Sequence, residues 1–589
     1  MILRMLYGKH CGCKAYLPTR GIILTCESLF HFFYSMFGRT FLRSTRCGIR
    51  RYSTAPINSS ARLVWTVALT SLSVGAVSYL FGRKQIQDNP PEGLFPHSST
   101  TKLSQISTPR YCTDSELEQA IAEVKAAIGE SKVTNTAIEL EAHTDNYFTP
   151  HAPLAHEKPR WVIYGTSTEE ISQIMKILHR YNVPVVPFSG GTSLEGHIFS
   201  TRQGVSLDTS RMNRILQINH DDLDVVVEAG VNWVKLNEEM QDKELLFGCD
   251  CGPNGLIGGM VNTNASGINA SRYGAMVQNV ISLTVVLADG TIIKTKQRPR
   301  KSSSGYNLTG LFIGSEGTLG IVTEATVKLH VKPAYETVVV GQFPRILDTT
   351  NTVAELFRRG IRPEAIELLD KDMMHCINYS GYWTKEWLEV PTLFFKLGGL
   401  SKSVVDETLA VVKEVSMQNN CKDFITAKDK KEEEELFSAR KNAFYAILNY
   451  GKNEIHEDVR LWVTDVAVPL SNLSLVLEKI RQMIVESGLQ SVILGHVGDG
   501  NFHADIFYAP SQKAECQALI DKITLLGLAN EGTASGEHGI GNGKRKYLPI
   551  ELGQDAVDTM RKVKMALDPK RLLNPDKVFK IDPNDNGEF

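Results

Sequence analysis

The ten cysteines of this sequence include no CxxC pair and no CxxCH haem-attachment motif. No covalently bound haem is therefore indicated, and we interpret the cysteines beyond residue 60 as buried or incidental side chains. Charge of one sign is not in excess either, since the formal net charge is −2 over 589 residues. A nucleic-acid partner is therefore not expected. The GxGxxG fingerprint that opens a Rossmann NAD-binding helix is also absent.

Acidic residues are nearly missing from the first 60 residues, which carry nine Lys or Arg and one acid, Glu27. The same stretch is rich in Ser, Thr and aromatic residues, a composition typical of mitochondrial presequences. The sequence RRYST at Arg50–Thr54 looks like a matrix-protease site with cleavage after Tyr52. We therefore predict a mitochondrial presequence over residues 1–52. A merely basic tail is the alternative.

Residues 63–82 carry no charge and lie between Arg62 and the pair Arg83-Lys84. Twenty apolar residues in a helix match the hydrocarbon thickness of a bilayer. We predict a transmembrane or stop-transfer helix here, which would place the protein in the mitochondrial inner membrane. The catalytic body would then face the intermembrane space. Residues 83–159 are expected to form a linker and an N-terminal helical segment.

Regular hydrophobic periodicity begins near residue 160 and is interrupted by three glycine-rich loops. The first loop, SGGTSLEGH, follows a predicted strand over residues 183–188, and its backbone N–H groups would form an anion nest suited to a pyrophosphate. Two more glycine-rich runs follow, at residues 252–274 and 311–333. Between these loops the pattern predicts strands over 205–215 and 223–230, a helix over 232–248, and a hairpin over 280–295 with its turn at Asp289-Gly290.

The motifs PFSGGTSLEG, GGMVNTNASGINASRYG and GSEGTLGIVTEATV resemble the FAD-binding domain of the vanillyl-alcohol-oxidase-type flavoproteins, over residues 160–333. The resemblance implies an α+β fold with a two-subdomain PCMH-type FAD-binding domain. Family members that bind FAD covalently often carry a His after the Gly-Gly pair, whereas Thr192 stands here, so we expect non-covalent FAD. The residues that the resemblance assigns to FAD are Ser189, Gly190, Gly191, Thr192, Ser193, Pro253, Gly258, Gly259, Thr263, Ser266, Gly267, Glu316, Gly317 and Ile321.

The stretch GHVGDGNFH, residues 495–503, holds two histidines on either side of a turn-forming sequence. The pattern predicts a β-hairpin with a two-residue turn at Asp499-Gly500. In that register His496 and His503 would be direct cross-strand neighbours, with Cβ atoms about 5 Å apart. Such a pair could share a metal ion. Two hydrogen-bonded histidines without metal are the more common arrangement when no third ligand is near.

A third ligand is offered by GTASGEHGIGNGKRKYL, in which Glu537 and His538 lie inside a glycine-rich loop. One carboxylate and two imidazoles make a His₂Glu set with an open position, the arrangement of a catalytic divalent metal site. His538 is not needed as a ligand and would be free to accept a proton near neutral pH.

The stretches GHVGDGNFH and GEHGIG resemble, in this order, the C-terminal part of the FAD-linked D-2-hydroxyacid dehydrogenases. With the FAD motifs, this resemblance extends from about residue 160 to Val578. It implies a divalent metal, zinc in most members and manganese in some. The implied metal ligands are His496, His503 and Glu537, and His538 is the implied catalytic base.

The same resemblance assigns two substrate-binding residues. Arg440, in a helix expected over residues 435–446, would pair with the substrate carboxylate, since a guanidinium suits bidentate binding. Asn574 lies in a closing segment that would return to the flavin. The expected domain bounds are 160–333 for the FAD-binding domain, 334–530 for a substrate (cap) domain of antiparallel sheet and helices, and 531–589 for the C-terminal segment.

These residues imply hydride transfer from C2 of a D-2-hydroxy acid to FAD. D-Lactate is favoured because Val463 stands where the family's 2-hydroxyglutarate enzymes tend to carry a Lys for the distal carboxylate. Cytochrome c is the expected electron acceptor. The alternatives are a dehydrogenase for D-2-hydroxyglutarate or another D-2-hydroxy acid, an FAD-dependent non-redox transferase of the same fold, and a binding protein without chemistry.

Overall fold

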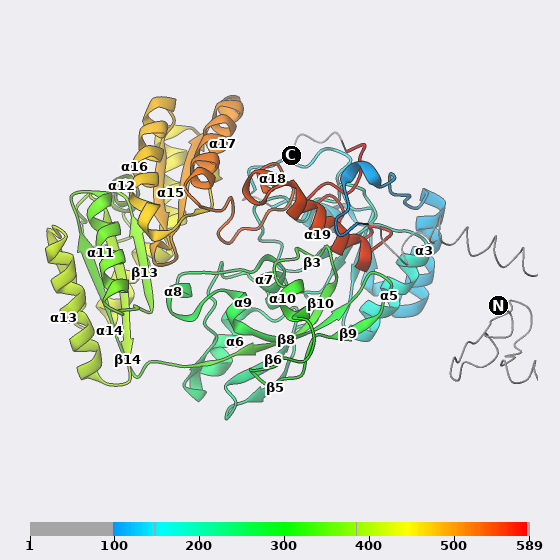
Figure 1. Ribbon diagram of the computed structural model, residues 1–589, viewed down its shortest axis with the longest axis horizontal. Coiled ribbons are helices and arrows are strands. Elements are labelled where there is room, and N and C mark those ends of the chain that lie inside the picture. Colours follow the sequence, from blue (N-terminus) through cyan, green and yellow to red (C-terminus); the bar gives the residue numbers. More distant parts are fainter. Residues whose placement is uncertain (1–97, 147–148, 384–385, 586–589) are drawn as a thin grey trace, which may run out of the picture. The chain divides into compact units, whose positions relative to one another are not determined.

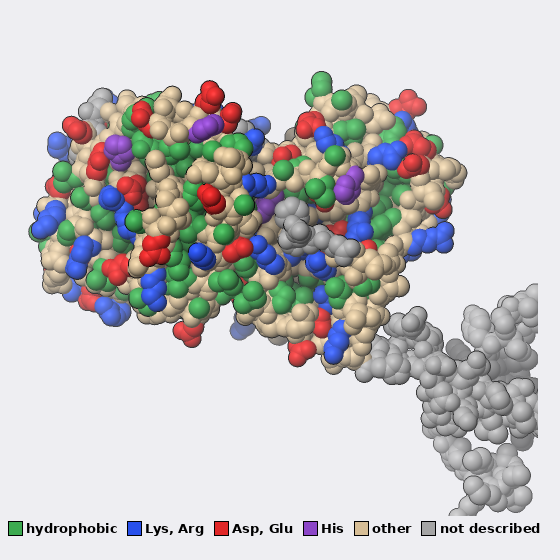
Figure 2. All heavy atoms as spheres, turned by 90° about the horizontal axis from the view of Figure 1, so that it is seen from above, with side chains coloured by type: hydrophobic (Ala, Val, Ile, Leu, Met, Phe, Trp, Pro, Cys, Tyr) green, Lys and Arg blue, Asp and Glu red, His purple; other side chains and the backbone are tan. Residues whose placement is uncertain are grey.

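The computed structural model describes residues 98–146, 149–383 and 386–585. The predicted presequence, 1–52, and the predicted membrane segment, 63–82, lie outside these residues. In the described part of the chain no helix has the length and apolar character needed to cross a membrane. On the face shown in Figure 2, basic and acidic side chains of the described residues are interspersed, in keeping with the near-zero net charge.

A four-stranded sheet of order β1-β2-β4-β3 forms the first part of the fold. Its three longer strands are parallel to one another, and two helices, α3 and α5, pack on it through a shared apolar core. Helix α5 begins where Ser167, as N-cap, accepts the Glu170 N–H with its Oγ at 3.2 Å. The elements are β1 (Val133–Thr134), β2 (Trp161–Tyr164), β3 (Val185–Phe188), β4 (Val205–Asp208), α3 (Asp114–Ile128) and α5 (Thr168–Arg180), with the short helix α4 (Ala137–Ala142) between β1 and β2.

A five-stranded antiparallel sheet of order β5-β6-β10-β8-β9 forms the second part. Its apolar side chains share a core with α6, α7 and α10. The elements are β5 (Ile215–Asn219), β6 (Asp224–Glu228), β8 (Val280–Val286), β9 (Ile292–Lys294), β10 (Ile321–Lys328), α6 (Trp233–Met240), α7 (Ile257–Thr263), α8 (Ala270–Tyr273), α9 (Met276–Asn279) and α10 (Leu308–Phe312), with β7 (Leu245–Leu246) and β11 (His330–Val331) paired beside them.

Two predicted elements of this region are wrong in extent. The strand expected over 205–215 is divided between β4 and β5, which belong to different sheets. The helix expected over 232–248 ends at Met240, because a short 3-10 turn follows and Glu244 adopts a left-handed conformation with φ of 54°. The predicted hairpin with its turn at Asp289-Gly290 is confirmed, since Val286 pairs with Ile292.

An antiparallel eight-stranded sheet of order β15-β12-β14-β13-β18-β19-β16 dominates the C-terminal half, with β17 paired to β19. Its strands β13 and β14 are labelled in Figure 1. Helices α11, α13, α16 and α17 share one apolar core with the sheet, and α12, α14 and α15 share the other. The strands are β12 (Tyr335–Gln342), β13 (Ala365–Leu369), β14 (Thr392–Gly399), β15 (Asp423–Thr426), β16 (Arg460–Val463), β17 (Val466–Ala467), β18 (Ser491–Gly495) and β19 (Asn501–Tyr508). The helices are α11 (Ile346–Arg358), α12 (Lys371–Ser380), α13 (Lys402–Gln418), α14 (Lys430–Lys441), α15 (Ala443–Tyr450), α16 (Leu470–Ser487) and α17 (Lys513–Ala529).

The predicted helix over 435–446 is in fact two helices, because α14 ends and α15 begins at Asn442, which has φ of −98° and ψ of 9°. The break places Arg440 in the last turn of α14. A cation is favoured there because helix carbonyl groups leave partial negative charge at a C-terminus.

The predicted register of the histidine hairpin is wrong. His503 in β19 pairs with Leu494 in β18, and a 3-10 turn over Val497–Asp499 replaces the two-residue turn. The wider loop packs its backbone closely against neighbouring elements: a Cβ on Gly498 would lie 2.6 Å from Ile366 of β13 and 2.8 Å from Ser271 of α8. A two-residue turn would leave too little backbone for these contacts, so the packing selects the longer loop.

The C-terminal segment returns to the first sheet after α18 (Leu548–Leu552) and α19 (Gln554–Leu567). Val185 of β3 donates its N–H to the Leu572 carbonyl at 2.8 Å, and Asn574 donates its N–H to Val185 at 2.7 Å. Lys564 of α19 is fully buried and donates to Asp568 and to the Thr318 carbonyl, both at 2.6 Å. These bonds bring Asn574 beside the first glycine-rich loop.

Candidate active site

A cavity of about 630 Å³ lies where the three glycine-rich loops meet residues of the eight-stranded sheet and the C-terminal segment. Of the fourteen residues predicted to bind FAD, all but Ser266 line it. Arg440, His496, Glu537, His538 and Asn574 also line this cavity, so residues from distant parts of the chain share one chamber. The structure does not bring Ser266 to the cavity wall.

The glycine-rich wall fits an extended ligand bound through backbone groups. Gly191 and Gly317 have φ of +63° and +70°, values that favour glycine, and a Cβ on Gly190 would lie 2.8 Å from the Asn254 carbonyl oxygen. Buried polar atoms of several lining residues have no hydrogen-bond partner among the described residues, including Ser189 Oγ, His197 Nδ1 and Asn574 Oδ1. Since buried polar atoms are nearly always paired, these residues fit a polar cofactor such as FAD.

Asn146 holds the first glycine-rich loop in place and was not identified from the sequence. Its side-chain amide donates to the carbonyls of Gly191, at 3.0 Å, and Ser193, at 2.7 Å. These two bonds fix the positions of both loop carbonyls, and the N–H groups of the same loop are the donors that would meet an anion.

His496, His503 and Glu537 come together at one end of the cavity. The Nε2 atoms of His496 and His503 lie 3.2 Å and 3.3 Å from Glu537 Oε1. These separations are close to the edge of about 3.3 Å in a tetrahedron with metal–ligand distances of about 2.0–2.1 Å. The rings are nearly perpendicular, with centroids 5.7 Å apart. The three residues therefore fit a divalent metal ion.

The hydrogen bond made by Nδ1 of each imidazole orients the ring so that Nε2 faces Glu537. His503 Nδ1 lies 2.9 Å from the Thr464 carbonyl oxygen, which can only accept, so Nδ1 carries the proton. His496 Nδ1 lies 2.7 Å from Glu367 Oε1 and likewise donates. Both Nε2 lone pairs are thereby directed toward Glu537, an arrangement that commonly supports metal-binding histidines.

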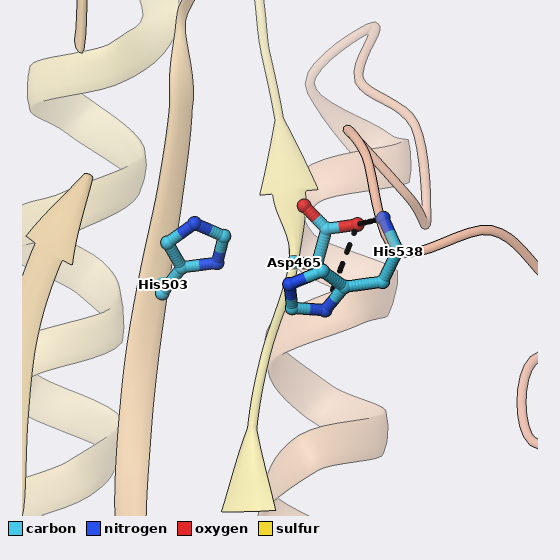
Figure 3. A group of neighbouring side chains, drawn as sticks. All are labelled: Asp465, His503 and His538. Carbon is cyan, nitrogen blue, oxygen red and sulfur yellow. Dashed lines mark hydrogen bonds and ion pairs between the residues drawn. The ribbon is translucent and has the colours of Figure 1, made fainter. Parts of the chain in front are cut away.

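Asp465, His503 and His538 form a second group of ligand-type side chains (Figure 3), which shares His503 with the first. Asp465 Oδ2 already accepts the backbone N–H groups of Glu537, at 2.9 Å, and His538, at 2.8 Å. It also accepts from Ser535 Oγ at 2.8 Å. We therefore interpret Asp465 as the residue that positions the Glu537-His538 turn, because its carboxylate is already saturated with donors.

Electrostatics in this cluster favour charged carboxylates beside the imidazoles. Burial alone would lower the pKa of His496, but the carboxylates of Glu367 and Glu537 raise it well above its ordinary value. Burial opposes ionisation of Glu537, yet His496 and His503 hold its pKa far below the usual range. A divalent cation would replace the protons of these imidazoles as the partner of Glu537.

His538 differs from the other two histidines. Its ring stacks on His503, with centroids 5.2 Å apart and planes at 9°, and its Nδ1 has no hydrogen-bond partner among the described residues. Burial lowers the pKa of His538; Asp465 opposes this shift, and the positive charges of His503 and Lys544 add to it. A neutral, partly buried imidazole at the cavity wall is suited to accept a proton.

Glu367 is a second residue that the sequence analysis missed. It lies in the middle of β13 with 0% exposure, and its carboxylate accepts from His496 Nδ1 at 2.7 Å and from Arg440 Nε at 2.8 Å. The only sequence signal is a single Glu inside the apolar stretch AIELL. Such a residue needs a buried partner, but the sequence does not say which.

The cavity wall near Arg440 also carries a second cation, Lys441. Val463, which served to argue against a distal carboxylate, is not among the residues that line the cavity. It lies in β16 opposite Asp505. The preference for a small substrate therefore does not follow from Val463.

Family models match two parts of this chain. Residues 159–296 match an FAD binding domain, and residues 332–578 match the C-terminal domain of FAD linked oxidases. The first match supports FAD as the ligand of the cavity.

The chain is 46% identical over 518 residues to D-lactate dehydrogenase (cytochrome), mitochondrial, of Kluyveromyces lactis. The aligned region covers 87% of this chain and 89% of that protein. The chain is 45% identical over 546 residues to D-lactate dehydrogenase (cytochrome) 1, mitochondrial, of Saccharomyces cerevisiae, covering 90% and 92%. Among solved structures, p-cresol methylhydroxylase with substrate bound has a TM-score of 0.67 at 18% identity, covering 82% of this chain and 100% of that chain. This likeness shows the fold alone, and it confirms the predicted PCMH-type architecture of mixed helices and sheets.

Replacing Gly259 with Ala tests whether FAD lies against α7. In the free protein only Ser189 lies within 4 Å of the added Cβ, at 3.5 Å, and Ala is favoured over Gly inside a helix, so the apoprotein should melt at or slightly above the wild-type temperature. A methyl group that overlaps a bound ligand costs about 1–3 kcal/mol, which corresponds to roughly 5- to 150-fold weaker FAD binding. Flavin absorbance per chain after gel filtration measures the effect. Wild-type FAD affinity in Gly259→Ala would show that this wall does not contact the cofactor.

Proposed function

The chain belongs to the FAD-linked D-lactate dehydrogenase family and oxidises D-lactate with FAD, and we propose that hydride passes from C2 of lactate to the flavin, leaving pyruvate. The observation that supports this proposal is the convergence of a possible metal triad, a guanidinium and a neutral imidazole on the wall of one FAD-sized cavity.

The residues of the three glycine-rich loops would hold the cofactor. Backbone N–H groups near Gly190 and Gly191 would bind the pyrophosphate. Asn574 would lie where the substrate site adjoins the flavin. Thr192 has no nucleophilic nitrogen for attachment to the isoalloxazine, so binding is proposed to be non-covalent. When bound, FAD supplies the hydride acceptor.

His496, His503 and Glu537 would hold a divalent metal, zinc first and manganese as the alternative. When bound, the metal polarises the hydroxyl of the substrate as a Lewis acid. The hydrogen bonds of Thr464 and Glu367 to the two imidazoles keep the Nε2 lone pairs free for this role.

Arg440 would bind the substrate carboxylate. Its Nε is held by Glu367, and among the described residues its Nη1 and Nη2 groups have no partner, which leaves two N–H edges for an anion. His538 would accept the hydroxyl proton, because its imidazole is neutral and lines the same cavity. With the carboxylate held by Arg440 and the hydroxyl proton taken by His538, the C2 hydrogen would be free to leave as hydride, for which bound FAD would be the acceptor.

Cytochrome c is the proposed electron acceptor. The chain has no CxxCH motif for a covalent haem, so electrons would leave the reduced flavin one at a time to an external carrier. The names of two similar proteins include the word cytochrome.

Lys441 supports a second candidate substrate, D-2-hydroxyglutarate. Lys441 follows Arg440 in the chain and lines the same cavity, so its ammonium group could meet a second, distal carboxylate. D-Lactate remains the first choice, because the similar proteins of high identity bear that name.

We further propose that residues 1–52 direct the chain to mitochondria and that residues 63–82 hold it in the inner membrane, with the catalytic body in the intermembrane space. The support is the basic, acid-poor leader and the uncharged stretch of twenty residues that follows.

Anaerobic mixing of the purified chain with D-lactate should bleach the visible absorbance of the flavin. L-Lactate and D-2-hydroxyglutarate serve as parallel substrates. Removing metal with a chelator should abolish bleaching, and zinc or manganese should restore it, because the hydroxyl then regains its Lewis acid. Bleaching by D-2-hydroxyglutarate alone would reassign the substrate, and no bleaching by any acid in FAD- and metal-loaded protein would favour a non-redox function.

The variant His538→Gln should lower kcat by about 10²- to 10⁴-fold, because the hydroxyl proton loses its acceptor. FAD and zinc contents should stay at the wild-type level. His220→Gln, at an exposed histidine outside the cavity, is the matched control and should leave kcat unchanged. Loss of zinc from His538→Gln would instead make His538 a ligand, in the group with Asp465 and His503.

Protease treatment of isolated mitochondria tests the location. With the outer membrane ruptured, the catalytic body should become accessible, and alkaline carbonate should leave the full chain in the membrane pellet. Deletion of residues 63–82 should release it to the supernatant. Protection from protease until detergent is added would place the body in the matrix.

A further inference from the structure

Glu367 occupies a position where a lone carboxylate would be unstable. Strand β13 lies between β14 and β18 inside the eight-stranded sheet, and all five of its residues are buried. On the same face of the sheet, Leu369 and Phe394 belong to an apolar core. Burying a carboxylate without hydrogen-bond partners is costly, so the position of Glu367 inside the sheet depends on the donors that meet it.

Its two partners are residues to which the proposed function assigns different tasks. Oε1 accepts the Nδ1–H of His496 at 2.7 Å, and Oε2 accepts the Nε–H of Arg440 at 2.8 Å. Arg440 comes from α14 and His496 from the loop after β18, so no local chain connection fixes their separation. The Glu367 carboxylate is the one direct bridge between them among the described residues.

In a 2-hydroxy acid, the hydroxyl and the carboxylate are attached to neighbouring carbon atoms. A site that binds both groups must therefore hold its hydroxyl-binding centre and its carboxylate-binding cation at a fixed short separation. Misplacement by about 1 Å can cost on the order of 100-fold in rate. Glu367 sets this separation, because it holds one metal ligand and the substrate guanidinium with two bonds from a single rigid carboxylate.

We propose that Glu367 is a positioning residue that couples the metal centre to the carboxylate-binding Arg440 and so selects 2-hydroxy acids. The inference rests on the proposed function. It adds that zinc affinity and the KM for D-lactate depend on the same side chain, although Glu367 contacts neither ligand.

The test compares Glu367→Gln with Glu364→Gln. Glu364 is a matched control: it is buried, stands three residues earlier, and is bound by Tyr273 and Arg272 outside the cavity lining. A Gln at 367 can accept from one partner but must turn its NH₂ group toward the other, which is itself a donor. We expect Glu367→Gln to weaken zinc binding by about 10- to 100-fold, measured by chelator competition. With zinc saturating, its KM for D-lactate should still rise at least tenfold, with FAD content unchanged.

Arg440→Lys and the double variant complete a thermodynamic cycle. Because Glu367 acts on lactate through Arg440, the increase in log KM of the double variant should be much smaller than the sum of the increases in the two single variants. The ratio of kcat/KM for D-lactate to kcat/KM for 3-hydroxypropanoate, the isomer with its hydroxyl on C3, should also fall in Glu367→Gln. Glu364→Gln should match the wild type in zinc affinity, KM and discrimination.

Wild-type zinc affinity and wild-type KM in Glu367→Gln would overturn the proposal. If Glu367→Gln binds zinc more weakly but has a wild-type KM for D-lactate at saturating zinc, Glu367 only supports His496. That result would also overturn the proposed coupling. If Glu367→Gln does not retain FAD, Glu367→Asp replaces it: the carboxylate keeps its charge but is one methylene too short to reach both partners. Wild-type behaviour of Glu367→Asp would contradict the proposal equally.

Failure of the proposed function is a separate result. It would appear in the wild-type protein as no zinc binding or no flavin reduction by D-lactate. Failure of the coupling would appear only in the comparison of the variants.

Discussion

The active site depends on buried acceptors that hold one glycine-rich loop, residues 535–545, between the two halves of the fold. Asp465 of the eight-stranded region accepts the N–H groups of Glu537 and His538, and Glu316 of the flavin cradle accepts those of Ile540 and Gly541, at 2.6 and 2.7 Å. The Glu195 carbonyl accepts from Asn542 and Gly543. Hydrogen bonds between backbone N–H groups and a charged carboxylate are stronger than neutral ones. The proposed metal ligand and base are therefore positioned by both halves at once, although they sit on a loop.

The same carboxylates place negative charge where imidazoles and cations need it. Lys544 illustrates the balance: burial would lower its pKa, but Glu195 and Asp465, at 3.1 and 3.7 Å, raise it. Glu367 and Glu537 act in the same way on His496. His538 lacks such a close pairing, and its pKa falls. One cluster thus contains imidazoles suited to bind a cation and one suited to accept a proton, and the difference comes from how near a carboxylate lies to each ring.

Sequence reasoning was reliable where function is written in contiguous motifs. The glycine-rich loops predicted an FAD-binding domain that the family model and the fold confirm, and thirteen of the fourteen residues assigned to FAD line the cavity. It failed where a local pattern allowed two solutions. The Asp499-Gly500 sequence fits a two-residue turn, but packing of Gly498 against β13 and α8 selects a longer loop and shifts the register of His503. The specificity argument from Val463 is not supported by the structure, because Val463 does not line the cavity, although D-lactate itself is the right substrate.

By itself, the sequence determined which residue types are present and in which motifs: a cradle with Thr192 where covalent FAD proteins often have a His, two histidines beside a turn, and a Glu-His pair in a glycine-rich loop. Only the tertiary structure decided which residues hold them. Glu367 lies 73 residues from Arg440 and 129 from His496, and Glu316 lies 225 residues from Gly541. Periodicity reports on neighbours within a helix turn or a strand pair, whereas these contacts exist only after separate sheets have packed together. A buried Glu in an apolar strand predicts that a polar partner exists, but only the tertiary structure identifies that partner.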